Sequence, residues 1–217
     1  MNVISDWSSY FPDLLEGLLV SVQLAAISLG LGIPLGLVLA IANGSGGRVA
    51  RAGAIVLVEI GRGMPALVML QIVYFGLPDL GLSFGSFVSA AVALTLTSAA
   101  YTSEIIRGGL QSVPAGEVEA AEALNMARLD ILRFIVIPQG MRVAVPSLMG
   151  FSILIFQATA LAYTIALPEL LATAYSIGSS TFRYMSVLVL AGLMYLAITI
   201  PMSFLTERVE MRLSRHL

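Results

Sequence analysis

The chain alternates long apolar stretches with short polar segments. A transmembrane helix takes about 20 apolar residues, and five stretches can supply them. They lie between Glu16 and Arg48, over about 52–77, between Asp79 and Glu104, between Arg142 and Glu169, and between Arg183 and Glu207. The pattern predicts an all-α polytopic membrane protein with five transmembrane helices, forming a single transmembrane domain over 1–217.

The second stretch is interrupted by Gly61-Arg62-Gly63-Met64-Pro65. Two glycines and a proline disrupt a helix and free backbone groups. Inside a membrane such a break is tolerated where it lines a cavity, and the half-helix that follows can hold a carboxylate at its N-terminus. A kink that only improves packing is the alternative. We favour the cavity, because Arg62 lies at the break and Gln71 lies farther along the same span.

A polar island over 101–148 separates the third and fourth spans. Within it, Ser112 is a candidate N-cap and Pro114 suits a first helical turn. Three glutamates follow near the positive end of the helix dipole, and Asn125 can take the left-handed turn that ends a helix. We expect a compact helix, about 114–127, that docks on another protein. An amphipathic helix lying on lipid is the alternative, but anionic lipid attracts basic helices and this segment has no base.

Two Glu–Arg pairs stand close to the proposed spans, Glu59 with Arg62 and Glu104 with Arg107. A spacing of three places each pair on one helix face. Ionisable groups inside a membrane usually face the protein interior or a watery cavity. Glu59, Arg62 and Glu104 are therefore candidates to line a path, and a structural ion pair at the end of each span is the alternative. We favour that alternative for Arg107.

Composition agrees with a membrane protein and restricts its chemistry. Hydrophobic residues make up 58% and charged residues 11%, where a soluble domain carries about 25% charged residues. The chain has no cysteine and no lysine, which excludes disulfides, a thiolate metal site and a phosphate-binding loop of the GxxxxGK[ST] kind. We expect no catalytic residue and no metal site here, so that any ATP is bound by another chain. A net charge of −2 argues against a nucleic-acid partner.

Arginine placement sets the expected orientation. Alternating the five spans puts nine of the eleven basic residues on one side, and an excess of basic residues marks the cytoplasmic side. The N-terminus is then outside, the C-terminus is cytoplasmic, and the polar island faces the cytoplasm.

Three segments carry a resemblance to a known family. They are Glu59–Pro78 (EIGRGMPALVMLQIVYFGLP), the stretch 94–124 with AYTSEIIRGGLQSVPAGEVEAAEAL at its heart, and Ile137-Pro138-Gln139 through Pro168-Glu169-Leu170-Leu171. With the five-span layout they cover most of the chain. The sequence resembles the permease (transmembrane) subunit of an ABC-type importer, in the polar amino acid uptake branch.

The resemblance implies a role for the short helix in the polar island. In this family the Glu-Ala-Ala region is a coupling helix that inserts into a groove on the ATPase. The residues that would couple to the ATPase here are Glu117, Glu119, Ala120, Ala121, Leu124 and Asn125. The expected substrate pathway takes in Arg62, Gly63, Met64, Gln71, Glu104, Gln157 and Thr159.

The same resemblance implies partners and a mechanism. A periplasmic amino-acid-binding protein delivers a polar amino acid to this chain and a second permease subunit, the same or similar, in the bacterial inner (plasma) membrane. A cytoplasmic dimer of ATP-binding subunits binds ATP and Mg, so that this chain carries no cofactor and is not an enzyme. ATP-driven closure of that dimer then drives alternating access across the lipid bilayer.

The chain departs from the family at three positions. Asn125 stands where glycine is usual, and Met64 where threonine is frequent. Many members have a Lys-Asp pair where this chain has Gln157-Ala158 before Thr159. Loss of that acid removes a partner for a basic head group. The substrate is then an acidic or neutral amino acid, or this chain is the non-binding half of a heterodimer.

Two other classes of protein remain open on the sequence. An ion-gradient-driven secondary amino acid transporter or channel half would be favoured by inverted repeats and by acids deep within several spans. A non-transporting membrane anchor would need neither a broken span nor intramembrane ions.

Overall fold

The computed structural model describes residues 6–45 and 47–213, and this part of the chain contains helices and no strands. The main helices run in chain order as α1 (Trp7–Ser45), α2 (Arg48–Gly63), α3 (Ala66–Gln71), α4 (Ser86–Gln111), α5 (Ala115–Ala123), α6 (Arg128–Ile131), α7 (Ile137–Ala158), α8 (Leu170–Thr181) and α9 (Tyr184–Leu213). Short π-helical or 3-10 turns extend them at η1 (Ile72–Gly76), η2 (Leu77–Leu80), η3 (Leu132–Val136) and η4 (Thr159–Ile165).

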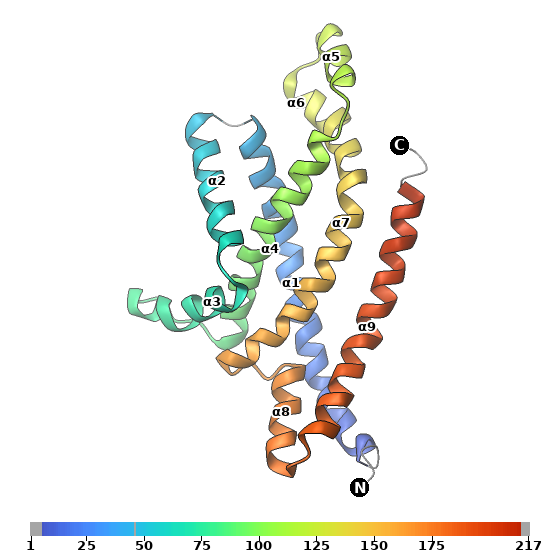
Figure 1. The fold of residues 1–217 in the computed structure, drawn as a ribbon. Helices are drawn as coiled ribbons and strands as arrows, with labels where there is room; N and C mark the ends of the chain where they lie inside the picture. The colour runs from blue at the N-terminus through green and yellow to red at the C-terminus, as the bar shows by residue number, and fades with distance from the viewer. Residues whose placement is uncertain (1–5, 46, 214–217) are drawn as a thin grey trace.

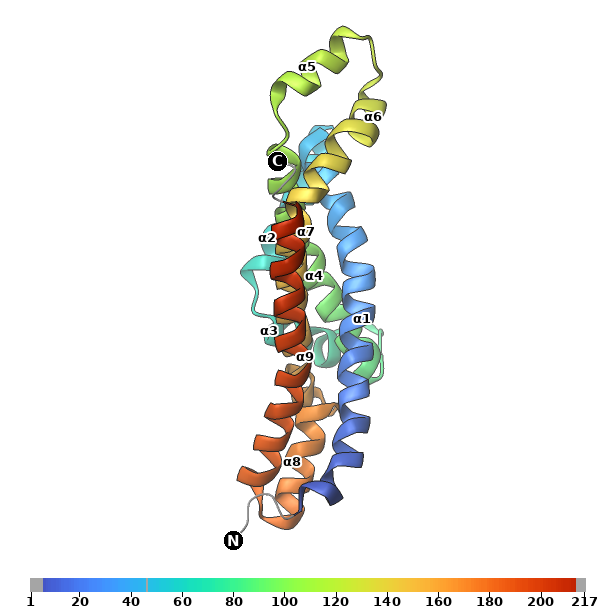
Figure 2. The same ribbon diagram turned by 90° about the vertical axis from the view of Figure 1, so that its right-hand side faces the viewer.

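Four long helices, α1, α4, α7 and α9, run along the length of the molecule (Figures 1 and 2). The helices α5 and α6 form one end, which we call the α5 end. The helix α8, the beginning of α1 and the beginning of α9 form the opposite end, the α8 end. The last turns of α9 and the first turn of α2 lie toward the α5 end, so the basic residues that they carry gather there.

Small residues bring α1 and α4 into close contact at the centre of the bundle. A Cβ added at Gly32 would collide with the side chain of Ser98, and one added at Gly36 would collide with Thr102 Oγ1. Close backbone approach through small residues is the usual way in which membrane helices pack. Gly32 and Gly36 therefore pack internally. A Cβ at Gly30 meets nothing within 4 Å.

Three helical stretches are long and apolar enough to cross a bilayer, at Trp7–Gly44, Arg128–Ile165 and Tyr184–Leu213. The bent pair of α2 and the helix over Ala66–Leu80 makes a fourth if it counts as one span. These counts hold for the described residues. The third expected span corresponds to α4, which is long but carries buried serines and threonines together with Glu104 and Arg107. The count of five transmembrane spans therefore stays a prediction, and it depends on whether α4 crosses the membrane.

The expected break in the second span is present and sharp. Helix α2 ends at Gly63, Met64 is extended, and Pro65 precedes α3. The two helical parts meet at 103°, so α3 and its continuation project sideways from the bundle (Figure 1). Proline cannot donate the next backbone hydrogen bond, which accounts for the position of the break.

At the α8 end, α1 begins at Trp7 and includes Pro12. Pro12 lies in the second helical turn, where it leaves one backbone carbonyl without its usual N–H donor. Trp7 Nε1 donates to Ser186 Oγ at 3.1 Å, and Asp6 forms an ion pair with Arg183. These contacts tie the start of α1 to the start of α9.

Candidate functional site

The helix α5 stands clear of the long helices at the tip of the α5 end (Figures 1 and 2). It begins at Ala115, with Pro114 in the N-cap position and no side chain capping it. The prediction that Ser112 caps this helix is wrong. Its hydroxyl instead donates to the carbonyl of Gly109 at 2.7 Å, at the end of α4. Proline fixes its own φ near −65°, so the chain can enter α5 without a side-chain cap.

The end of α5 confirms the expected left-handed turn. Asn125 has φ +57°, and asparagine is one of the few residues that tolerate this region. The Asn125 N–H donates to the Glu122 carbonyl at 2.9 Å, and the Met126 N–H donates to the Ala121 carbonyl at 3.2 Å. The substitution of asparagine for the usual glycine therefore leaves a closed helix end. The remainder of the expected element, up to Ala127, is a turn that leads into α6.

The residues expected to couple to an ATPase divide into two groups. Glu119, Ala120 and Asn125 are exposed, and Leu124 is 77% exposed. Ala121 is buried and faces the rest of the chain.

A side-chain hydrogen bond tethers α5 to α7. Gln139 Nε2 donates to Glu117 Oε2 at 2.6 Å, across 22 residues of chain. Hydrogen bonds to an ionised acceptor are stronger than neutral ones. Glu117 thus anchors α5 rather than presenting a free carboxylate. The sequence motif Ile137-Pro138-Gln139 contained the partner, but nothing in the pattern indicated this contact.

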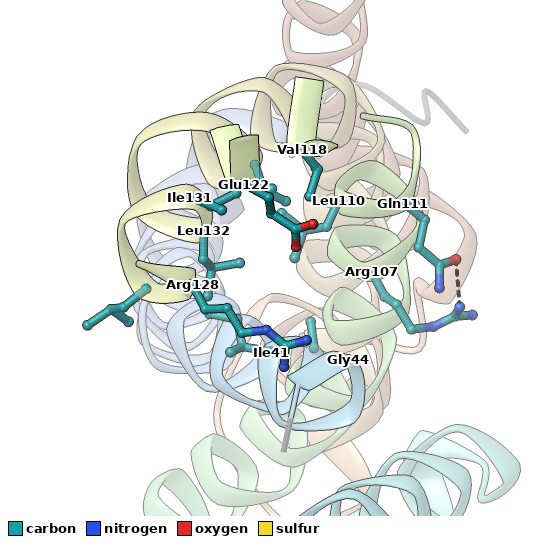
Figure 3. Close-up of a pocket in the computed structure, with 13 residues that line it drawn as sticks. Ile41, Gly44, Arg107, Leu110, Gln111, Val118, Glu122, Arg128, Ile131 and Leu132 are labelled. Atoms are coloured by element: carbon teal, nitrogen blue, oxygen red, sulfur yellow. Dashed lines mark hydrogen bonds between the residues drawn. The ribbon is translucent and has the colours of Figure 1, made fainter. Parts of the chain in front are cut away.

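A cavity of about 630 Å³ lies behind α5. Its walls come from the ends of α1 and α4 on one side and from α5, α6 and η3 on the other (Figure 3). Leu110, Val118, Ile131 and Leu132 contribute apolar surface, and Arg107, Gln111, Glu122 and Arg128 contribute polar groups. Nothing in the sequence indicated that Glu122 and Arg128 line one cavity, because this depends on how α6 folds back beside α5.

An ion-pair cluster connects the break in the second span with α4. Arg62 Nη1 lies 3.4 Å from Glu104 Oε2, and Arg107 donates to both oxygens of Glu104 at 2.9 and 2.6 Å. Arg107 Nη1 also donates to Gln111 Oε1 at 2.9 Å. The pairing of Glu104 with Arg107 is confirmed. The alternative of an ion pair between Glu59 and Arg62 is not what the structure has, because Arg62 reaches across to Glu104 of α4.

Glu59 is nevertheless near the same cluster. It is exposed, and it lines a second cavity of about 380 Å³ together with Glu104 and Arg107. Tyr101 donates to the backbone carbonyl of Arg62 at 3.3 Å, a further contact between α4 and the break. The structure thus gathers acids and bases of α2 and α4 on one polar surface.

The other residues expected on a substrate pathway are spread over the surface and interior. Gln71 Nε2 donates to Thr164 Oγ1 at 2.9 Å, which joins the projecting α3 to η4. Gln157 is exposed, whereas Thr159 is fully buried and donates to the Phe156 carbonyl. Met64 is half-buried against a hydrophobic cluster, and a Cβ at Gly63 would meet nothing within 4 Å. Arg62 and Glu104 are brought together, and Thr159 is not accessible.

Residues 32–215 match the family described as "Binding-protein-dependent transport system inner membrane component". The arginine transport system permease protein ArtQ of Bacillus subtilis is 34% identical over 203 residues, 93% of each chain. The glutamine transport system permease protein GlnP of Escherichia coli is 32% identical over 213 residues, 96% of this chain and 97% of that one.

A solved structure described as an amino acid ABC transporter with histidines has a similar fold. The TM-score is 0.89 at 30% identity, covering 95% of this chain and 97% of that chain. The chain therefore belongs to the family of binding-protein-dependent transport system inner membrane components, as a permease subunit of the amino-acid ABC transporter type.

Proposed function

We propose that this chain translocates a polar amino acid across the bacterial inner membrane by alternating access, and that α5 couples it to a separate ATPase. The docking surface is Glu119, Ala120, Leu124 and Asn125, supported from behind by Ala121 and by the Glu117–Gln139 tether. The observation that carries the proposal is the exposure of Leu124 on a helix that protrudes beyond the bundle. An apolar side chain in that place is stabilised when a partner covers it.

Orientation and span count follow from the same arrangement. With α5 in the cytoplasm, the start of α2 and the end of α9 are also cytoplasmic, which agrees with the basic residues gathered there. The N-terminus is then periplasmic and the C-terminus cytoplasmic. We count α4 as the fifth span, because its polar residues face neighbouring helices rather than lipid.

The proposed partners are those that this kind of subunit requires. They are a dimer of ATP-binding subunits, a second permease chain, identical or similar, and a periplasmic amino-acid-binding protein. ATP and Mg belong to the ATP-binding subunits, so that this chain performs no catalysis. Gly30 lies on an open face of α1 and can take part in the contact with the second permease.

The ion-pair cluster supplies the proposed link between the pathway and α5. Arg62 lies at the break, Glu104 joins it to α4, and α4 leads directly to the segment that carries α5. A movement of α5 that shifts the end of α4 therefore strains a contact at the break. Intramembrane charges of this kind usually mark a path or a gate.

The proposed substrate preference rests on one position at which this chain differs from many family members. Ala158 stands beside Gln157 where many family members have an acid, so this chain lacks a partner for a basic head group. Ala158→Asp is expected to increase binding of L-arginine relative to L-glutamine in the reconstituted transporter. Unchanged selectivity favours the other hypothesis, in which the second permease of a heterodimer binds the substrate.

The deciding experiment reverses one charge at the docking surface. Glu119→Arg is compared with wild type and with Glu210→Arg, an exposed glutamate near the end of α9. Retention of the ATPase by the affinity-tagged permease and the rate of amino-acid uptake are measured. Glu119→Arg is expected to release the ATPase and stop uptake, while Glu210→Arg retains both. Unchanged association in Glu119→Arg would contradict the proposal and favour the ion-gradient-driven alternative.

A further inference from the structure

The cavity behind α5 contains two charged groups of opposite sign with no partner. Glu122 projects into it from α5, and Arg128 projects into it from the start of α6 on another side (Figure 3). Within the described part of the chain, neither side chain has a hydrogen bond or an ion pair. The third charged group, Arg107, turns its guanidinium to Gln111 and Glu104 and is already satisfied.

These two charges restrict the kind of ligand that fits. A simple anion would be drawn to Arg128 and repelled by Glu122, and a simple cation would meet the reverse arrangement. A ligand that carries an ammonium group and a carboxylate satisfies both. The volume of about 630 Å³ lies within the usual range for small-molecule pockets.

The remaining lining suits the side chain of such a ligand. Leu110, Ile131 and Leu132 present apolar surface to the same cavity, and Gln111 adds one amide. Water is displaced more easily from an apolar floor, which strengthens charge-assisted hydrogen bonds at its edges. A free α-amino acid combines these features in one molecule.

We infer that the cavity behind α5 binds a free α-amino acid, with the carboxylate on Arg128 and the ammonium group on Glu122. The walls belong to two parts that move relative to each other in the proposed mechanism: α1 and α4 in the bundle, and α5 with α6 outside it. A bound amino acid bridges these parts and holds α5 in one position. Accumulated amino acid in the cytoplasm therefore slows further uptake. This effect on uptake rests on the proposed coupling role of α5, whereas the binding does not.

Binding is tested on the permease–ATPase complex in nanodiscs of phosphatidylcholine and phosphatidylglycerol, without the binding protein. The probe is L-glutamine, measured by calorimetry, with N-acetyl-L-glutamine and L-glutaminamide as probes that each lack one charge. We expect L-glutamine to bind at least tenfold more tightly than either relative. Arg128→Gln and Glu122→Gln are each expected to weaken L-glutamine binding at least tenfold, and Arg212→Gln, an exposed arginine at the end of α9, is expected to leave it unchanged.

The relatives of the probe add a pairwise check. L-glutaminamide keeps only the ammonium group, so its residual binding is expected to depend on Glu122 and not on Arg128. N-acetyl-L-glutamine is expected to show the reverse dependence. Binding that is lost in Arg62→Ala but kept in Arg128→Gln would place the ligand on the substrate pathway and overturn the inference. Displacement of L-glutamine by added phosphatidylethanolamine would overturn it as well, because the cavity would then be a lipid head-group site.

The consequence for transport is measured separately. In cells preloaded with L-glutamine, uptake of labelled substrate by wild type is expected to slow at least threefold, and Arg128→Gln is expected to remove most of this slowing. Equal slowing in wild type and Arg128→Gln would overturn the regulatory role. A wild type that takes up no amino acid and retains no ATPase would instead contradict the proposed function, and the calorimetric result would still decide the binding site.

Discussion

The two ends of the molecule treat their polar groups in opposite ways. At the α8 end, Glu169 is fully buried and accepts hydrogen bonds from the backbone N–H groups of Leu171 and Ala172, at 2.9 and 2.7 Å. Ser21 and Tyr195 donate to the same carboxylate. This carboxylate is thus hydrogen-bonded within the chain, with donors from α1, α8 and α9, although Phe182 and Met185 at the same end are 87% and 73% exposed.

At the α5 end, by contrast, two charged side chains have no hydrogen-bond or ion-pair partner within the described residues. Glu122 and Arg128 face a cavity without partners, and the apolar side chains of Leu124 and Leu129 are 77% and 73% exposed. Burial of such side chains is favourable, so an isolated chain gains nothing from holding them in water. Glu169 therefore needs no partner outside this chain, whereas the side chains at the α5 end are available to other molecules.

The largest effect is expected from the bundle that joins the two ends. Gly36→Leu places a side chain where α1 contacts Thr102 and the backbone of Ala99. Overpacking of this kind costs about 3 kcal/mol or more where the backbone cannot yield. We expect loss of the folded permease, measured as the yield of monodisperse protein and its thermal unfolding in detergent.

The control for Gly36 lies on the same helix. Gly30→Leu meets open space and is expected to change the stability of the isolated chain by less than about 0.5 kcal/mol. Equal losses in the two variants would show that α1 is held by its helical propensity or its lipid contacts and not by close packing on α4.

The next effect separates the two ends. Glu169→Ala removes the N-cap of α8 and leaves four donors without their acceptor, which is expected to lower the stability of the permease by about 3 kcal/mol. Because the α5 end is remote, association with the ATPase at low temperature should be unchanged. Thermal unfolding and ATPase retention are measured on the same preparation, with Glu207→Ala as the exposed control. Loss of ATPase binding would show that the ends are coupled more tightly than the contacts indicate.

These contacts also show which features of the structure could be predicted from the sequence. The break at Gly61–Pro65, the left-handed Asn125 and the pairing of Glu104 with Arg107 depend on residues close together in the chain, and local rules predicted them. The contact of Arg62 with Glu104 and the hydrogen bonds from Ser21 and Tyr195 to Glu169 join residues far apart in sequence. Their geometry depends on how helices cross, which hydrophobic periodicity does not specify. Hydrophobic periodicity also could not predict the cavity behind α5, because its walls come from five helical segments, α1, α4, α5, α6 and η3.

A smaller effect is expected from loss of the hydrogen bond between Gln139 and Glu117, which tethers α5 to α7. Gln139→Ala removes the donor to Glu117 and frees α5 from α7. A hydrogen bond to a charged group at an exposed site contributes about 1 kcal/mol, so ATPase association is expected to weaken roughly fivefold. Affinity for the ATPase is measured by titration, with Gln23→Ala on the exposed side of α1 as control. A loss as complete as that expected for Glu119→Arg would mean that the tether, and not the exposed face, forms the docking surface.

The smallest effect is expected at Ser112, which the sequence wrongly predicted to be the N-cap of α5. Ser112 satisfies the usual description of an N-cap, yet its hydroxyl bonds back to the carbonyl of Gly109, and α5 begins three residues later. Loss of a true N-cap costs about 1 kcal/mol, whereas loss of an exposed back-bonded hydroxyl costs roughly a few tenths. Ser112→Ala is therefore expected to leave both unfolding and ATPase association within error of wild type, while Pro114→Gly, which frees the chain at the start of α5, weakens association about twofold to fivefold. If Ser112→Ala instead has the larger effect, the hydroxyl caps α5 when the ATPase is bound, and the α5 end changes its backbone on docking while the α8 end does not.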